Sequence, residues 1–256
     1  MIFTDSHTHL YLPEFDDDRH MVIHRAIKAG IERMFLPNID SHTIRMLHSM
    51  CSLKPSSLFP MMGLHPCSVD ENYLKELSLV EKLLTEKRYA AVGEIGIDLY
   101  WDIKFKKEQI EAFTSQVKLA KNHNLAVVIH VRNAFDDVFE VIDLLNDDTL
   151  KGIFHCFNGN EQQAMKALSY GGFKLGIGGM ITFKNSTLTG VVEKIKLEDI
   201  VLETDAPYLT PAPHRGKRNE SVYLVQIAKK IAQIKRCSLQ AVADVTTSNS
   251  REVFGM

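Results

Sequence analysis

The feature that most constrains this chain is a short apolar run that recurs eight times, each time followed by a segment with helical spacing. The runs begin near residues 2, 33, 58, 90, 126, 152, 173 and 200. Their separation is about the length of one β-strand plus its crossover helix. In the segment 108–123, Ile110, Phe113 and Val117 recur at helical spacing, and the segment 222–234 has the same pattern.

Eight strand–helix units in 256 residues predict a TIM (β/α)8 barrel, formed as a single domain by residues 1–256. No linker or low-complexity tract divides the chain. The alternative is a doubly wound open sheet, which usually carries a glycine-rich phosphate loop after its first strand. The motif D-S-H-T-H-L stands at that place here, so the barrel is favoured.

Composition and charge restrict the location and the partners of the protein. There is no run of about 18 apolar residues, as a membrane span requires, and the first residues lack the basic and apolar regions of a signal peptide. The four cysteines are scattered, without a C-x-x-C pair. We therefore expect a cytoplasmic protein. Its formal net charge of −2 gives no general electrostatic attraction to nucleic acid.

Chemistry-bearing side chains follow six of the eight runs, at the end of the barrel where active sites form. These side chains are His7 and His9 after the first run, His65 after the third, Glu94 and Asp98 in the fourth, His130 and Arg132 in the fifth, His155 in the sixth, and Glu203 and Asp205 in the eighth. Several form i, i+2 pairs, and residues two apart share one face of a strand. Imidazoles and carboxylates gathered on one face match the ligands of zinc, manganese or magnesium.

Each of these residues also has an ordinary structural interpretation. A single histidine at a strand end is more often a hydrogen-bonded structural residue than a ligand, and a single acidic residue can cap a helix. Such a structural interpretation would have to hold independently at seven positions, so we predict a metal site instead. Helical or connecting segments hold the histidines that we expect at the surface, namely His20, His24, His42, His48 and His123. The alternation of side chains along the sixth run directs Cys156 away from the barrel axis, so we expect it to pack in the core. The role of Cys67 is left undecided.

The motifs D-S-H-T-H-L, G-L-H-P, G-E-I-G-I-D, I-H-V-R-N-A, H-C-F-N-G and L-E-T-D-A-P-Y-L-T-P, followed by H-R-G-K-R-N-E, resemble those of the TatD family of metal-dependent deoxyribonucleases. The resemblance covers the whole chain, in order. The departures are Asn158 and Ser221, where the family commonly has serine and proline; neither is an expected ligand.

The resemblance implies a centre of two divalent metal ions (magnesium, manganese or zinc). One ion would be held by His7, His9 and Asp205, and the other by His130 and His155. Glu94 would bridge them. His65 and Glu203 look like additional catalytic pocket residues of the family, which either touch the metal or position the substrate phosphate. Asp205 is placed to accept a proton from an attacking water.

Local positive charge predicts the side that meets substrate. We expect Arg132, Arg215, Lys217 and Arg218 to bind phosphate and Trp101, beside Tyr100, to stack on a base. Because the net charge is small, the expected partner is single-stranded or frayed DNA, held over a few nucleotides at a strand end. The expected enzyme is an exonuclease that works as a monomer without a membrane or an obligate protein partner.

Two competing functions stay open at the level of the sequence. The same scaffold can hydrolyse other esters or amides, for example as a deacylase of mischarged aminoacyl-tRNA. A non-catalytic, metal-stabilised binding module is the other alternative, but a site that had lost catalysis would be expected to have lost ligands. Metal identity and cleavage polarity cannot be read from the residues.

Overall fold

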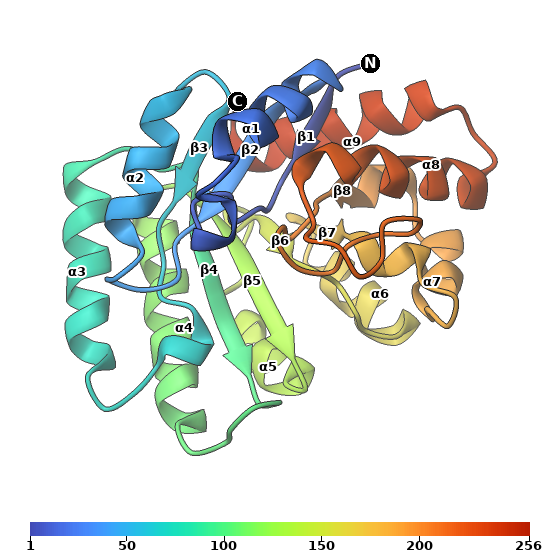
Figure 1. Cartoon of the computed structure of the whole chain (residues 1–256). Helices are drawn as coiled ribbons and strands as arrows, with labels where there is room; N and C mark the ends of the chain where they lie inside the picture. Colours follow the sequence, from blue (N-terminus) through green and yellow to red (C-terminus); the bar gives the residue numbers. More distant parts are fainter.

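The computed structural model describes residues 1–256, in which parallel strands alternate with helices that lie outside them (Figure 1). The strands are β1 (Phe3–Asp5), β2 (Ile31–Pro37), β3 (Leu58–Met61), β4 (Ala91–Asp98), β5 (Ala126–Arg132), β6 (Gly152–Phe154), β7 (Phe173–Ile177) and β8 (Ile200–Leu202). The helices are α1 (Arg19–Lys28), α2 (Ile44–Leu53), α3 (Tyr73–Glu86), α4 (Lys106–Asn122), α5 (Phe135–Leu145), α6 (Glu161–Ser169), α7 (Leu188–Lys194), α8 (Leu224–Lys235) and α9 (Leu239–Phe254).

The strands pair in parallel and in sequence order, as β1-β2-β3 and as β4-β5-β6-β7-β8. Backbone contacts join the two sheets at both edges. An isolated parallel bridge links Met62 to Val92, and the N–H of Ser6 donates to the carbonyl of Leu202 at 2.9 Å. The predicted (β/α)8 barrel is therefore confirmed as the fold.

The helices pack through the apolar faces that their spacing predicts. In α4, Phe113 and Val117 are fully buried, and burial of each such side chain stabilises the fold by roughly 1.5–3 kcal/mol. The segment 222–234 forms α8, as expected, after one turn of 3-10 helix. These faces belong to a cluster of 61 buried apolar residues that extends from Phe3 to Ala243.

A smaller apolar cluster fills the inside of the barrel at the end opposite the strand C-termini. Ala91 and Ala126, the first residues of β4 and β5, lie there with Phe35 and Val128. The last turn of α9 closes this end, because the ring of Phe254 stacks on Phe35 at 3.7 Å between centroids. The helix α9 follows the eighth strand–helix unit and was not among the predicted segments.

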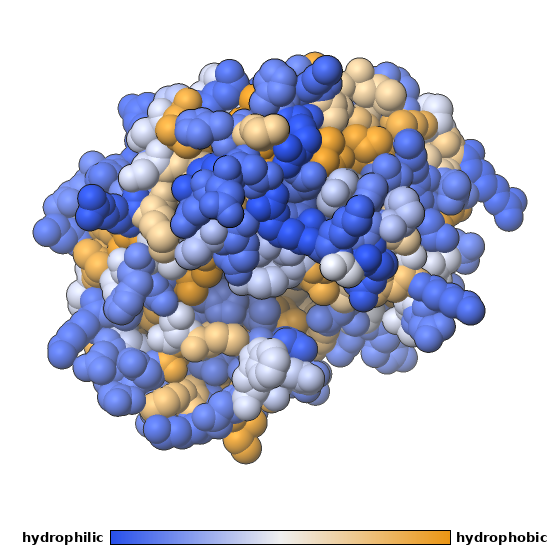
Figure 2. Space-filling view, in the orientation of Figure 1, coloured by the Kyte–Doolittle hydropathy of each residue, from blue (hydrophilic) through white to orange (hydrophobic).

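Three of the strands that lead to the site are shorter than expected. The strands β1, β6 and β8 have three residues each, so His7, His9, His155 and Asp205 lie in the loops just beyond them. The longest loop follows β8 and crosses the barrel mouth before α8 (Figure 1). The face in Figure 2 is mostly hydrophilic, interrupted by small apolar groups. No helix combines the length and apolar character needed to cross a membrane.

Candidate metal centre

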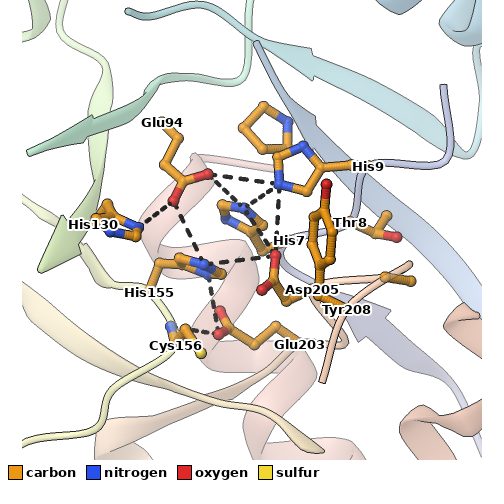
Figure 3. A network of polar contacts seen from close by, with 12 residues as sticks. His7, Thr8, His9, Glu94, His130, His155, Cys156, Glu203, Asp205 and Tyr208 are labelled. Carbon is orange, nitrogen blue, oxygen red and sulfur yellow. Dashed lines mark hydrogen bonds and ion pairs between the residues drawn. The ribbon is translucent and has the colours of Figure 1, made fainter. Parts of the chain in front are cut away.

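Five imidazoles surround one buried carboxylate at the C-terminal end of the barrel, and Figure 3 labels four of them, His7, His9, His130 and His155. The carboxylate is Glu94 of β4, which is 2% exposed. The imidazoles come from the loops after β1, β3 and β6 and from β5, and belong to His7, His9, His65, His130 and His155. Asp205, after β8, joins the cluster through its Oδ1 atom.

The Oε2 atom of Glu94 faces the two histidines that follow β1. It lies 3.0 Å from Nε2 of His7 and 3.6 Å from Nε2 of His9, and these two nitrogens are 3.2 Å apart. The Oδ1 atom of Asp205 is 3.5 Å from Nε2 of His9 and 3.8 Å from Nε2 of His7. Tetrahedral zinc, bound at about 2.0–2.1 Å, holds its ligand atoms roughly 3.3 Å apart. The separations of these four donor atoms therefore fit a metal ion.

The Oε1 atom of Glu94 faces the other three imidazoles. It lies 2.8 Å from Nδ1 of His130, 3.4 Å from Nε2 of His65 and 3.6 Å from Nε2 of His155. One carboxylate thus presents one oxygen to each half of the cluster. His7, His9 and Glu94 form one group whose donor atoms lie close enough to share an ion, and His65, Glu94 and His130 form another.

Backbone conformation brings the donors into this position. Gly96 has φ +142°, and a Cβ atom there would lie 2.0 Å from the carbonyl oxygen of His130, so glycine allows β4 to approach β5 closely. Asp205 has φ +55°, a left-handed conformation that aspartate tolerates better than most residues. Its side chain points toward His9 and is 14% exposed.

Asp5 precedes His7 by only two residues in the motif D-S-H-T-H-L, but it lies apart from the cluster. The strand β1 ends at Asp5, and its carboxylate accepts hydrogen bonds from the backbone N–H and the hydroxyl of Thr204, at 2.9 and 2.7 Å. Burial raises the pKa of Asp5 to about 7. This carboxylate joins β1 to the end of β8, which closes the barrel beside the site.

Charge is finely balanced among these buried groups. Burial lowers the pKa of His7 to about 3, assisted by the charge of His155. Burial also opposes protonation of His155 and His130, but nearby carboxylates outweigh it and raise the pKa values to about 10 and about 9. Conversely, the histidines outweigh burial at Glu94 and hold its pKa well below the usual range. The cluster thus stabilises positive charge next to Glu94, where a divalent cation would supply it.

Two residues outside the cluster fix its histidines. The sequence placed one of them, Asp98, among the candidate metal-binding side chains without a specific role, and it did not point to the other, Tyr11. Asp98 Oδ2 lies 2.8 Å from Nε2 of His130, and Tyr11 Oη lies 3.1 Å from Nδ1 of His9. Such outer partners orient metal-ligating histidines. Their spacing was a usable signal, since Tyr11 is two residues after His9 and Asp98 is four after Glu94. Tyr11 also lines a cavity of about 530 Å³ between α1 and α2, which contains none of the converging ligands.

Glu203 requires a correction, because it was predicted to be a catalytic residue in the pocket. Its side chain is fully buried behind His155, and its Oε1 atom lies 3.1 Å from Nδ1 of that ring. The same oxygen accepts the backbone N–H of Cys156. Burial raises the pKa of Glu203. Glu203 therefore positions His155 and is shielded from substrate.

The prediction that Cys156 packs in the core was wrong. The strand β6 ends at Phe154, and Cys156, with φ +45°, lies in the loop beside the cluster. Its thiol groups with His155 and Asp205, and burial raises the pKa of the thiol well above the usual value. Cys67, which the sequence left undecided, is exposed.

Of the histidines expected at the surface, His20, His24 and His42 are exposed. His48 and His123 are only half-buried, so the surface assignment holds for them in part. The ring of His48 lies 2.9 Å from the hydroxyl of Tyr89, which accounts for its burial.

Arg132 and two exposed aromatic rings lie next to the metal ligands. The guanidinium of Arg132 is 3.5 Å from the ring centre of Tyr100 and 5.2 Å from that of Trp101. The two rings meet edge to face, and Trp101 is 72% exposed. These cation–π contacts hold the guanidinium of Arg132, which is two residues after His130 in the sequence.

The basic residues of the loop after β8 are not equivalent. Arg215 is exposed, with its guanidinium 3.8 Å from the ring centre of Phe183, and Lys217 is also exposed. Arg218 instead makes a bidentate ion pair with Asp18, at 2.8 and 2.9 Å. Arg218 was predicted to contact substrate, but its guanidinium is committed to joining this loop to the start of α1.

A (β/α)8 barrel with histidines and carboxylates converging at the C-terminal ends of its strands defines a metal-dependent hydrolase. Comparison with known proteins agrees. The family model described as TatD related DNase matches residues 4–255, and the chain belongs to this family. It is 34% identical over 255 residues to the uncharacterized metal-dependent hydrolase YabD of Bacillus subtilis, which covers 99% of both chains.

Other relatives point to the same family. The uncharacterized metal-dependent hydrolase TatD of Mycobacterium tuberculosis is 31% identical over 261 residues, covering 98% of this chain and 97% of its own. Among solved structures, the TatD homologue YjjV of Escherichia coli superimposes with a TM-score of 0.93 at 27% identity, covering 99% of this chain and 98% of its own.

Proposed function

We propose that this protein is a metal-dependent deoxyribonuclease that shortens single-stranded or frayed DNA from an end, with two divalent ions, magnesium, manganese or zinc. The observation that carries the proposal is the position of Glu94. Its Oε2 atom faces His7 and His9, and its Oε1 atom faces His130 and His155. A carboxylate so placed can bridge two ions.

The residues divide into two ligand sets in this proposal. His7, His9 and Asp205 hold one ion, and His130 and His155 hold the other. Two divalent ions in such a centre supply Lewis acidity and lower the pKa of water. Asp205 accepts the proton of the attacking water, because its histidine neighbours outweigh burial and keep its pKa below the usual value, so that it is ionised at neutral pH.

Substrate binding falls to the groups at the barrel mouth. Arg132 binds the phosphate next to the metal ligands, and Trp101 stacks on a base. Arg215 and Lys217 contact neighbouring phosphates from the loop after β8. With a net charge of −2, this small basic surface suits a few nucleotides at a strand end. The four cysteines are all free thiols, which agrees with action in the reducing cytoplasm. In this proposal the protein works as a monomer.

The direct test is cleavage of 5′- and 3′-labelled single-stranded DNA by purified protein in magnesium, manganese or zinc. We expect stepwise shortening from one end that requires metal. Glu94→Ala and Asp205→Asn should abolish it while leaving the circular dichroism spectrum unchanged. Intact DNA in every metal, together with metal-dependent hydrolysis of a carboxylic ester or an aminoacyl-tRNA, would refute the nuclease and support the carbonyl hydrolase.

A further inference from the structure

The five histidines around Glu94 differ in what their outward nitrogen contacts. A neutral imidazole carries one proton, so a hydrogen bond at one nitrogen decides whether the other offers a lone pair or an N–H. A metal ion requires the lone pair. The outer partner of each ring therefore shows whether the ring can be a ligand.

His9 and His155 have acceptors on their outward nitrogens. The hydroxyl of Tyr11 donates to the carbonyl of Pro37 at 2.7 Å, so its oxygen accepts the Nδ1–H of His9. For His155, the charged Oε1 atom of Glu203 lies 3.1 Å from Nδ1, without the geometry of a hydrogen bond, and its negative charge favours a proton on Nδ1. In both rings the proton lies outside, and Nε2 presents its lone pair to the centre.

His130 follows the same rule with its nitrogens exchanged. Its Nε2 atom meets Asp98 at 2.8 Å, and its Nδ1 atom faces Glu94. With a metal ion at Nδ1, the carboxylate of Asp98 retains the Nε2 proton. His7 has no polar partner at Nδ1, so nothing outside the ring prevents its Nε2 from acting as a ligand.

In His65 the proton and the lone pair are exchanged relative to His9 and His155. Its Nδ1 atom accepts the backbone N–H of Cys67 at 3.0 Å, because His65 caps the short 3-10 helix Pro66–Ser68. A backbone N–H can only donate, so Nδ1 must be unprotonated and the single proton lies on Nε2. The Nε2–H group faces the Oε1 atom of Glu94 at 3.4 Å.

We propose that His65 is not a metal ligand, and that it donates its Nε2–H to a non-bridging oxygen of the substrate phosphate. The side chain of His65 is 15% exposed, so substrate can reach it. This role rests on the proposed phosphodiesterase function. The donor is preoriented by the cap, and no proton is transferred.

Nuclear magnetic resonance of the protein loaded with ¹¹³Cd tests the ligand assignment independently of activity. We expect scalar coupling from cadmium to the rings of His7, His9, His130 and His155, and none to His65. Long-range ¹H–¹⁵N spectra should show a protonated Nε2 and a bare Nδ1 for His65, identified by its absence in His65→Gln. Coupling at His65, or loss of bound cadmium in His65→Leu, would overturn the inference.

Kinetics of two substitutions test the donor role. His65→Leu removes the donor, and His65→Gln restores an N–H of similar reach. We expect both to keep the full metal content. His65→Leu should lower kcat/KM on a dinucleotide about 100-fold, with partial recovery in His65→Gln. The exposed His42→Leu serves as the matched control and should change neither quantity.

The outcomes separate this inference from the function on which it rests. If the protein cleaves DNA and His65→Leu is equally active, the donor role is wrong and the nuclease stands. If the protein is inactive on DNA, but inorganic phosphate binds the cadmium form and this binding is lost in His65→Leu, the nuclease is wrong and the donor role is supported.

Discussion

At the scale of single residues, partners behind the histidines fix the orientation of the rings in the candidate metal centre. His130 lies between two carboxylates, and only one of them, Glu94, belongs to the centre. The other, Asp98, is held by the backbone N–H of Tyr100 at 2.9 Å. This arrangement fixes the rotation of the His130 ring before any metal arrives.

The substitution Asp98→Asn tests this positioning role. The amide can still accept from Tyr100, but the charge that holds the Nε2 proton of His130 is lost. We expect metal affinity to fall about 10- to 100-fold, with little change in thermal stability. Competition with a chromophoric chelator measures it. Asp102→Asn, an exposed carboxylate of the same loop, is the control; equal affinity in both variants would contradict the role.

At the scale of elements, β7 contributes to the site through Gly176, which leaves room for a neighbouring carboxylate. Gly176 lies where a Cβ atom would stand 2.2 Å from Oε2 of Glu203. The carboxylate has no room to move, because it is buried and contacts His155 and Cys156. Gly176 of β7 thus provides the space that Glu203 needs in order to fix the ring of His155, which follows the neighbouring strand β6.

We predict that Gly176→Ala displaces Glu203 and with it His155. Metal affinity should fall at least as far as in Asp98→Asn, and the chelator assay would show it. Gly190→Ala, in α7, has no atom within 4 Å of the added methyl group, and alanine there should raise the melting temperature slightly. Unchanged metal binding in Gly176→Ala would contradict the positioning role of Glu203.

The elements also show where sequence reasoning succeeds. The helical spacing of 108–123 predicted the buried face of α4, and the alternation placed His7, His9, Glu94, His130 and Asp205 at one end of the barrel. These patterns depend on local periodicity, which a sequence displays.

The failures at Arg218 and Glu203 concern partners 200 and 48 residues away, Asp18 and His155, which no local pattern encodes. Cys156 failed because alternation no longer applies once a strand has ended.

At the scale of the whole molecule, Asp18 links the first helix of the barrel to the loop that follows the last strand. It accepts from Arg218 in the last loop and from Arg25 in α1, and Arg25 also pairs with Glu220 at 2.7 Å. The hydrogen bond from Arg218 lowers the pKa of Asp18 from 3.8 to about 2. The stabilisation is therefore present above about pH 4 and is lost as the pH falls toward 2.

Asp18→Asn should lower the free energy of unfolding by about 1 kcal/mol at pH 7, a figure reduced for solvent screening of this partly exposed pair. Urea unfolding at several pH values would measure it. The difference between the variant and the parent should be constant from pH 7 to 5 and shrink below pH 4. A difference that grows on acidification would show that another group is responsible.

The apolar cluster that Phe254 closes and the candidate metal centre lie at opposite ends of the barrel. Phe254 closes the bottom of the barrel against Phe35, and the metal ligands lie at the top. We predict that Phe254→Ala lowers the free energy of unfolding by about 3 kcal/mol, while metal affinity and kcat at 25 °C stay at parental values. Leu144→Ala, 84% exposed on α5, should leave both unchanged. Altered metal affinity in Phe254→Ala would show that the two ends are coupled.

The donors around Glu94 are drawn from positions as distant as His7 and Asp205. During translation, the first histidines leave the ribosome long before Asp205 does. The cluster around Glu94 is therefore complete only after β8 and Asp205 have emerged and the barrel has closed. Chains released from the ribosome before that point accordingly lack the full set of donors.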